Sequence, residues 1–179
     1  MKNKVKHTKG FSLSELLITA AIIAVLVSCS IPIFASKLEK SRRAVDIVNA
    51  RKIRSAITNI LNDGTLTFLK EDMGYAISVT SGGINMRLVN GNWENVLIKG
   101  KKVDNNNSMG TNLFIYLRPY GVSNNWKVKQ KFSSVTWYGV VVYGNGESYY
   151  YEGTGTPSSF DAETTRKYSW ENMDTPLSP

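Results

Sequence analysis

The stretch that decides the fold of this chain is KGFSLSELLITAAIIAVLVSCSIPIFAS, residues 9–36. From Leu16 to Ser36 it contains no charged side chain, and Glu15 stands immediately before that run. As a helix, the uncharged run rises roughly 31 Å, which matches a bilayer hydrocarbon core of about 30 Å. We therefore predict a membrane-spanning helix. The longest apolar run further along, SSVTWYGVVVYG, is interrupted by glycine and rich in β-branched and aromatic residues, which indicates a strand.

The composition indicates one domain with an appendage. The chain has 179 residues, with 22 Lys and Arg against 14 Asp and Glu, one Cys and one His. A single Cys excludes an intramolecular disulfide framework, and one Cys with one His cannot form a zinc site of Cys and His ligands alone. The net charge is +8, but the lysines of the acid-free segment 1–10 supply half of it. Because removal of this segment would leave a net charge of only +4, nucleic acid is not expected as a partner.

The segment KGFSLSELLITAAIIAVL combines a basic leader that ends at Gly10, an apolar run opened by Phe11, and a single carboxylate, Glu15. This pattern resembles the class III signal of type IV pilins and related pseudopilins. The resemblance implies that a prepilin peptidase cleaves after Gly10 and methylates the new amine of Phe11. Pro32 stands where the family usually has a kinking proline, whereas Ala24 replaces a frequent glycine.

The same resemblance implies a fold, a function and partners. The fold is α+β, with a long N-terminal helix packed on an antiparallel sheet. The function is that of a structural subunit, assembled through its N-terminal helix into a type IV pilus for adhesion, motility or aggregation. The partners are further copies of the chain, other pilins, the prepilin peptidase and the pilus assembly platform. Before assembly the chain would span the cytoplasmic membrane once, with its N-terminus inside, and afterwards it would belong to an extracellular filament. The family's C-terminal cysteine pair is absent, which points to Gram-positive relatives.

Other functions of the N-terminal segment remain open. A minor pilin or pseudopilin of a competence (DNA-uptake) or type II secretion machine would share every N-terminal feature. The tetrapeptide Leu26-Val27-Ser28-Cys29 has a lipobox pattern, and acylation of Cys29 would anchor a surface binding module. An ordinary secretory signal peptide would explain the basic start, but the bulky residues 31–34 crowd its candidate cleavage sites.

Glu15 carries a chemical requirement of its own. An unpaired carboxylate at the edge of the hydrocarbon is costly, so it needs a partner or a proton. After cleavage, the amine of Phe11 lies one helical turn away on the same face. Pairing within one chain would neutralise both groups, and pairing between chains would set the register of neighbouring subunits. The alternative is that Glu15 is a tolerated interfacial residue.

Residues 37–63 predict an amphipathic helix that continues the membrane helix, with Gly64 at its C-cap. From Phe11 to Asp63 an unbroken helix would measure roughly 80 Å. Its basic residues are expected on a solvated face or against acidic neighbours, with anionic lipid as the alternative contact. Apolar residues that recur near the helical repeat are expected to face the sheet, and these are Leu38, Val45, Val48, Ile53, Ala56, Ile57 and Ile60.

Short β-type runs separated by Gly and Asn follow Gly64 and predict an antiparallel sheet. The expected strands are 75–80, 84–89, 93–98, 112–118, 126–132, 134–144 and 147–152, with turns at 81–83, 90–92 and 145–146. The predicted organisation is a removable leader at 1–10, a transmembrane and assembly helix at 11–36, an amphipathic helix at 37–63, a sheet domain at 64–174 and a tail at 175–179.

Residues suited to catalysis or metal binding do not gather in the sequence, so we expect no enzyme, cofactor or metal site. The single His lies in the leader, and the acids at 71–72 and at 161 and 163 are expected to be solvated loop charges. The run 104–110, DNNNSMG, resembles a calcium loop only loosely, because Ile115 stands where a bidentate Glu belongs. Six aromatic residues are expected to pack in the core, and these are Trp137, Tyr138, Tyr143, Tyr149, Tyr150 and Tyr151.

Overall fold

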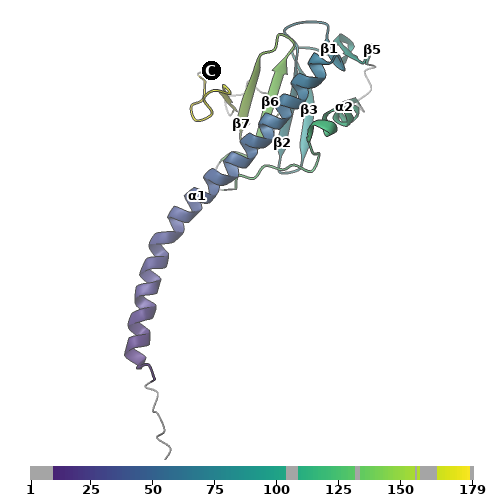
Figure 1. Ribbon diagram of the computed structural model, residues 1–179. Helices are drawn as coiled ribbons and strands as arrows, with labels where there is room; N and C mark the ends of the chain where they lie inside the picture. The colour runs from purple at the N-terminus through teal and green to yellow at the C-terminus, as the bar shows by residue number, and fades with distance from the viewer. Residues whose placement is uncertain (1–9, 104–108, 132–133, 156, 158–164, 178–179) are drawn as a thin grey trace, which may run out of the picture. The chain divides into compact units, whose positions relative to one another are not determined.

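The computed structural model describes residues 10–103, 109–131, 134–155, 157 and 165–177. The chain forms two compact units that divide between Lys40 and Ser41, and each is described by itself. The long helix α1, Leu13–Asn62, begins in the first unit and ends in the second. Strands, a second helix and short 3-10 turns follow α1 in the second unit (Figure 1).

Helix α1 has nearly the extent that the sequence predicts. It ends at Asn62, one residue before the expected end, and Pro32 lies inside it. Gly64 follows with a φ of 74°, the left-handed conformation in which helices commonly end. The N–H of Gly64 donates to the carbonyl of Leu61 at 3.2 Å. The uncharged run and the amphipathic part therefore belong to one helix.

The strands of the second unit form two antiparallel sheets, which confirms the α+β class with a long N-terminal helix. The larger sheet has the order β3-β2-β6-β7-β8, with the bounds Ile84–Val89, Gly74–Thr80, Trp137–Tyr143, Ser148–Gly153 and Thr165–Tyr168. The smaller sheet has the order β1-β4-β5, with the bounds Leu66–Phe68, Val96–Ile98 and Lys101–Lys102.

Two hairpins form where the turn signals place them. Strands β2 and β3 pair up to Val79 and Ile84, across the Gly-containing turn 81–83. Strands β6 and β7 pair up to Val142 and Ser148, across the turn that contains Gly146. Gly146 has a φ of 89°, which a residue with a side chain rarely adopts. The expected strands at 75–80, 84–89, 134–144 and 147–152 are thereby confirmed, with small shifts at their ends.

The prediction of a strand at 112–118 is wrong, because helix α2, Met109–Leu117, occupies most of this segment. Leu113 and Leu117 are buried whereas Ile115 is exposed. Residues four apart share a face of a helix, and this spacing therefore buries the two leucines together. A short apolar run does not distinguish a buried strand from a buried helix by composition alone.

Other strand predictions also need correction. The expected strand 93–98 is a strand only from Val96 onward, because the 3-10 turn η1, Trp93–Asn95, comes first. Residues 126–131 form no strand, and residue 132 lies outside the described residues. The sequence patterns did not indicate β1, β5, β8 or the 3-10 turn η2, Arg118–Tyr120.

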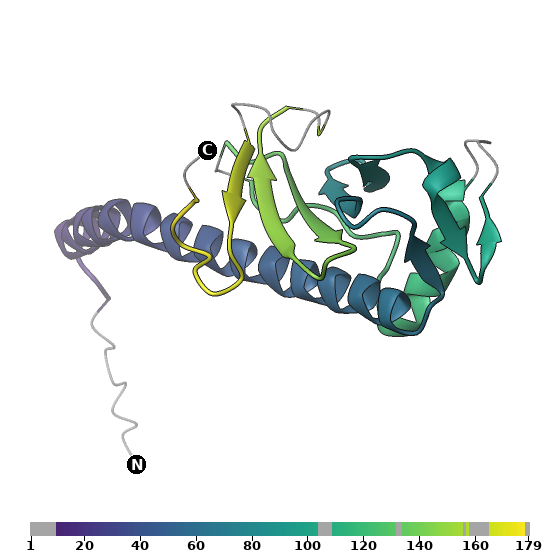
Figure 2. The same ribbon diagram turned by 90° about the horizontal axis from the view of Figure 1, so that it is seen from above.

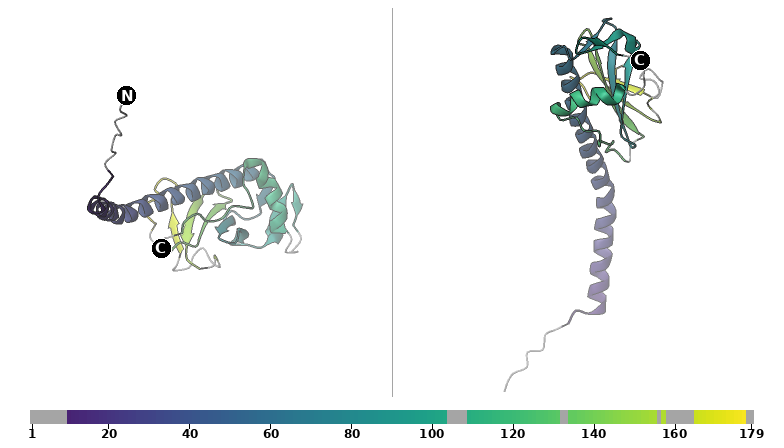
Figure 3. Two further views of the ribbon diagram at one scale, coloured as in Figure 1. Left: turned by 90° about the horizontal axis from the view of Figure 1, so that it is seen from below. Right: turned by 90° about the vertical axis from the view of Figure 1, so that its right-hand side faces the viewer.

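The part of α1 in the second unit covers one face of the larger sheet (Figure 2; Figure 3). Ile53, Ala56, Ile57 and Ile60 are buried there, which confirms the C-terminal part of the predicted apolar stripe. They share a core with inward-facing residues of β2 and β6, which are Tyr75, Ile77, Val79, Tyr138, Val140 and Val142. The stripe prediction is wrong for its first members, because Leu38, Val45 and Val48 are exposed.

The half-buried Arg43 and the buried Glu152 connect α1 to β7 and to the C-terminal loop. Arg43 Nε donates to Glu152 Oε1 at 3.1 Å, and Arg43 Nη2 donates to the carbonyl of Met173 at 2.6 Å. The same carboxylate of Glu152 accepts hydrogen bonds from the hydroxyls of Tyr150 at 2.8 Å and Tyr168 at 3.2 Å. A buried carboxylate is tolerated when its lone pairs are satisfied in this way. Arg43 is therefore not part of a solvated basic face.

Asp46 accounts for the irregular backbone at 126–131. Its carboxylate is fully buried and accepts the backbone N–H of Lys129 at 3.0 Å and that of Gln130 at 3.2 Å. These N–H groups would otherwise need another acceptor, such as a neighbouring strand. Burial raises the pKa of the Asp46 carboxyl to about 6, although the two N–H groups act in the opposite direction.

We expect the stability of the fold to depend on the protonation of Asp46. Its pKa of about 6 in the folded chain lies above the ordinary value of 3.8. Protonated Asp46 therefore contributes stability that is fully present below about pH 4 and is lost as the pH rises through about 6. Asp46→Asn stays neutral at every pH. The melting temperature of the native chain minus that of Asp46→Asn should therefore fall between about pH 4 and pH 7.

Thermal melts of the full-length chain in detergent, recorded at several pH values, measure this difference. Asp72→Asn, in an exposed turn, is the matched control and should melt with the pH dependence of the native chain. A difference between Asp46→Asn and the native chain that stays constant over this pH range would contradict the raised pKa of Asp46.

Candidate functional site

The candidate site is the N-terminal end of α1, which carries the residues that the sequence assigns to cleavage and assembly. Gly10, Phe11 and Ser12 precede the helix and lie outside regular secondary structure. Gly10 is exposed, and the side chain of Phe11 is 86% exposed. The peptide bond between Gly10 and Phe11 therefore lies in an accessible, non-helical segment, the kind of segment that a peptidase can bind.

Ser12 and Glu15 form a reciprocal capping box at the start of α1. The backbone N–H of Glu15 donates to the hydroxyl of Ser12 at 3.2 Å, and the backbone N–H of Ser12 donates to Glu15 Oε2 at 2.9 Å. The first backbone bond of the helix follows, from the N–H of Leu16 to the carbonyl of Ser12 at 3.2 Å. This arrangement satisfies two N–H groups that a helix start leaves without intrahelical partners.

The capping box also directs the carboxylate of Glu15 toward the N-terminus. Glu15 lies in the first turn, where the helix dipole favours negative charge. One of its oxygens, Oε2, is held at the N–H of Ser12, the residue next to Phe11. The other, Oε1, makes no hydrogen bond to any residue that the structure describes. The sequence analysis assigned Glu15 but missed Ser12, although the spacing Ser12-x-x-Glu15 is a recognised signal for a capping box.

The N-terminal part of α1 presents apolar side chains all around its surface. Its large apolar residues are exposed, and they are Leu13, Leu16, Leu17, Ile18, Ile22, Ile23, Val25, Leu26, Val27, Ile31, Ile33 and Phe34. By length and composition, this part of α1 is sufficient to cross a membrane. An exposed apolar surface of this extent indicates contact with lipid or with another protein.

Three hydroxyl side chains of the apolar run bond to the backbone of their own helix. The hydroxyl of Thr19 donates to the carbonyl of Leu16 at 2.9 Å, that of Ser28 to Val25 at 2.8 Å, and that of Ser30 to Leu26 at 2.7 Å. Hydroxyls satisfied in this way need no water. The run is therefore compatible with a hydrocarbon environment, where an unsatisfied polar group is costly.

Cys29 and Pro32 both lie inside α1. Cys29 has a free, exposed thiol. It lies between Ser28 and Ser30, whose hydroxyls donate to backbone carbonyls of the same helix. The helix continues through Pro32, whose missing N–H removes one intrahelical bond. Neither residue is close in sequence to the capping box. Of the site residues assigned from the sequence, Gly10, Phe11 and Glu15 lie at the helix start together with Ser12.

The remaining sequence candidates that the structure describes do not form a second site. Residues 104–108 of the calcium-like run lie outside the described residues, as do Asp161 and Glu163. Glu71 and Asp72 are exposed. Within the described ranges, no group of three or more His, Cys, Asp or Glu side chains is arranged to hold a metal ion.

The aromatic residues pack as expected. Tyr138 and Tyr150 belong to the core beneath α1, whereas Trp137 and Tyr151 belong to a smaller cluster on the opposite face of the sheet. Tyr143 and Tyr149 are partly buried against that smaller cluster. Of the basic residues of α1, Arg54 lies 5.0 Å from the centre of the Trp170 ring, a cation–π contact.

Comparison with known proteins supports the N-terminal interpretation. Residues 5–28 match the family model of the prokaryotic N-terminal methylation motif. This match confirms the resemblance to the class III signal of type IV pilins, and the long helix α1 begins within the matched segment, at Leu13. No curated protein and no solved structure shows a significant similarity to the chain. The matched segment includes the whole capping box and ends at Ser28.

We expect Ser12→Ala to weaken the first turn of α1. Replacing a capping serine by alanine costs about 1 kcal/mol, so the amide hydrogens of the first turn should exchange about fivefold faster. Ser12→Thr keeps the hydroxyl and should restore slow exchange. Hydrogen exchange of the full-length chain in detergent micelles measures this effect.

Ser30→Ala is the matched control, because its hydroxyl bonds within the helix and far from the helix start. Its first-turn exchange should equal that of the native chain. Unchanged exchange in Ser12→Ala would mean that the capping box does not stabilise the start of α1.

Proposed function

We propose that the chain is a structural subunit of a type IV pilus. In this proposal a prepilin peptidase cleaves after Gly10 and methylates Phe11, and the subunit then assembles through residues 11–36 into a surface filament. The observation that carries the proposal is the N-terminal methylation motif at residues 5–28, which overlaps the exposed apolar start of helix α1, Leu13–Asn62. The signal and the helix support membrane anchoring before assembly, with the N-terminus on the cytoplasmic side.

The exposed apolar side chains explain why such a subunit needs two environments. In the membrane, lipid covers the N-terminal part of α1, which supports a single-pass protein of the cytoplasmic membrane. When the subunit leaves the bilayer, these side chains need an equally apolar cover, because burial of apolar surface contributes about 25 cal/mol per Å². The same helix of other subunits supplies that cover. Other copies of the chain, other pilins and the pilus assembly platform are therefore the proposed partners.

In this proposal, Glu15 sets the register of neighbouring subunits in the filament. Cleavage after Gly10 creates a charged amine on Phe11, next to the residue whose N–H already holds Glu15 Oε2. The second oxygen, Oε1, is directed to the same end of the helix and can accept a hydrogen bond from the amine of a neighbouring subunit. A buried carboxylate without a partner is costly, so subunits in which each Glu15 meets an amine are favoured. Pro32 is proposed to ease bending of the helix during packing.

A minor pilin or pseudopilin would have the same N-terminal features. It would differ from a major pilin in being less abundant and in belonging to a competence or secretion machine. The amount of the chain in sheared filaments separates the two roles, because a major subunit dominates the filament by mass. Loss of DNA uptake or of secretion on deletion of the gene, with filaments intact, would instead support the minor role. A surface lipoprotein anchored through Cys29 has less support, because Cys29 lies within a continuous helix.

We expect Glu15→Gln to reduce the yield of filaments strongly while the capping box survives. Glutamine at this position still accepts the N–H of Ser12, but it has no charge to pair with the Phe11 amine. The variant should be cleaved normally, and the yield of sheared filaments should fall at least about tenfold, which corresponds to about 1.4 kcal/mol per contact. Electron microscopy and immunoblotting of sheared surface fractions measure the yield.

Glu71→Gln, at an exposed turn of the second unit, is the matched control and should assemble normally. Comparison with Glu15→Ala separates the two roles of the carboxylate, since alanine removes both the cap and the charge. Normal filaments in Glu15→Gln, with loss only in Glu15→Ala, would assign Glu15 to capping and refute the proposed ion pair.

A further inference from the structure

A groove lies between α1 and the loop that follows β8, entirely within the second unit. Figure 2 shows this loop, in yellow, beside α1. The volume of the groove is about 440 Å³, which is within the range of small-molecule sites. Five residues of α1 and one residue of the loop line it, and they are Arg51, Arg54, Ser55, Thr58, Asn59 and Trp170.

The lining residues of α1 share one face of the helix. Residues three and four apart are neighbours on a helix surface, and Arg51 precedes Arg54 by three residues and Ser55 by four. Thr58 and Asn59 continue this face by one more turn. Two guanidinium groups are therefore neighbours, next to two hydroxyls and an amide.

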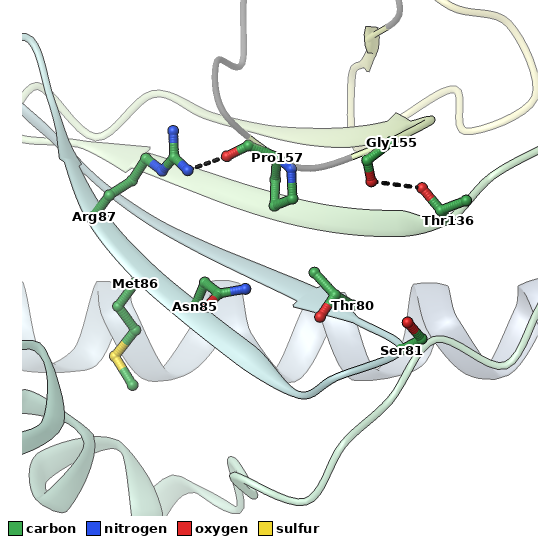
Figure 4. A pocket seen from close by; sticks show the side chains of 8 residues that line it. All are labelled: Thr80, Ser81, Asn85, Met86, Arg87, Thr136, Gly155 and Pro157. Atoms are coloured by element: carbon green, nitrogen blue, oxygen red, sulfur yellow. Dashed lines mark hydrogen bonds between the residues drawn. The ribbon is translucent and has the colours of Figure 1, made fainter.

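The two guanidinium groups form no ion pair with a carboxylate in the described part of the chain. Between Asp46 and Asp63, α1 contains no acidic residue, and Glu171 of the loop is exposed. Like charges one helical turn apart repel each other, so an anion that contacts both groups is favoured. The groove at the β2–β3 hairpin differs in this respect, because its Arg87 already donates to the carbonyl of Pro157 (Figure 4).

The remaining polar groups of the groove are hydrogen-bond donors that a ligand can use. The hydroxyl of Thr19 donates to its own helix, whereas those of Ser55 and Thr58 bond to none of the described residues, and neither does the amide of Asn59. On the loop side, the indole N–H of Trp170 is buried and has no acceptor among the residues that the structure describes. A lining in which every side chain can donate complements a ligand rich in acceptors.

The wall formed by the loop is held in place by contacts with α1 and with the sheet. The centre of the Trp170 ring lies 5.0 Å from Arg54 Cζ and 6.1 Å from the centre of the Tyr150 ring. Further along the loop, the carbonyl of Met173 accepts a hydrogen bond from Arg43 Nη2 at 2.6 Å. Because these contacts fix the loop and orient one guanidinium group, the groove is formed before any ligand binds, which reduces the ordering cost of binding.

We propose that this groove binds a phosphate monoester, with its phosphate between the guanidinium groups of Arg51 and Arg54 and its oxygens accepting the hydroxyls of Ser55 and Thr58. Such a phosphate has three acceptor oxygens and a charge of about −1.5 to −2 at pH 7, and guanidinium groups match its geometry. A carboxylate offers less charge and fewer oxygens to the same donors. The volume of about 440 Å³ leaves room for a small alcohol group on the ester. This binding function is independent of the residues proposed for filament assembly.

The test is a titration of the full-length chain with glycerol 3-phosphate, inorganic phosphate, dimethyl phosphate and acetate, followed by ligand-observed NMR. The chain is kept in a nonionic detergent, which carries no phosphate. Glycerol 3-phosphate should bind with a Kd of about 1 mM, inorganic phosphate no more tightly, and the monoanions dimethyl phosphate and acetate without saturation. Arg51→Gln should bind glycerol 3-phosphate about tenfold more weakly, because a charged donor to the phosphate is lost.

Lys52→Gln is the matched control, because Lys52 is exposed on α1 outside the groove and its replacement removes the same charge. It should bind glycerol 3-phosphate like the native chain, and thermal melts should show both variants folded. Equal weakening in Lys52→Gln and Arg51→Gln would assign the binding to the overall basic charge of the helix and overturn the proposed site. Saturable binding of acetate, tighter binding of inorganic phosphate than of the ester, or no saturable binding of glycerol 3-phosphate would each refute the proposal, as would unchanged binding in Arg51→Gln.

Discussion

An apolar helical surface with nothing to cover it is the constraint on which the rest of this structure depends. From Leu13 to Phe34 the large apolar side chains of α1 are exposed, and the hydroxyls of Thr19, Ser28 and Ser30 bond to carbonyls of the same helix. Such a segment is stable in lipid or against other helices, and both environments exclude water. Glu15 can stand at the edge of this surface because Ser12 already bonds one of its oxygens. The start of the helix thus combines a cap, a charge and the accessible peptide bond at which we propose cleavage.

In the second unit, α1 packs on the sheet through both apolar and polar contacts. Toward the C-terminal end of the helix, Ile53, Ile57 and Ile60 bury apolar surface against the sheet. Closer to Lys40, polar contacts of Arg43 and Asp46 replace the apolar ones. Removing one partner of a buried ion pair destabilises a fold far more than replacing both partners by apolar residues, because the remaining charge stays buried without a partner. These charges therefore make the position of the helix on the sheet specific, and they tie β7 and the segment 126–131 to it.

The features that follow from local chemistry could be predicted from the sequence. An uncharged run as long as the hydrocarbon core of a bilayer predicts a membrane helix, and glycine turns between alternating strands predict the β2–β3 and β6–β7 hairpins. Features that depend on partners far away in the sequence could not be predicted from it. Residues 126–131 resemble a strand, but the buried Asp46, far away in sequence, takes their N–H groups. Helix α2 resembles a strand because its short apolar run carries no clear period. At the candidate site, Glu15 is identifiable by its charge, and Ser12 only by its spacing from Glu15.

Mass spectrometry of the mature N-terminus tests the central claim most directly. The chain is purified from membranes and from surface fractions of the cells that make it, and its N-terminal peptide is sequenced. The account predicts a chain that begins at Phe11 and carries one methyl group on its amine, with Cys29 unmodified. A mature chain that begins at an acylated Cys29, or one that retains residues 1–10 in surface fractions, would contradict it.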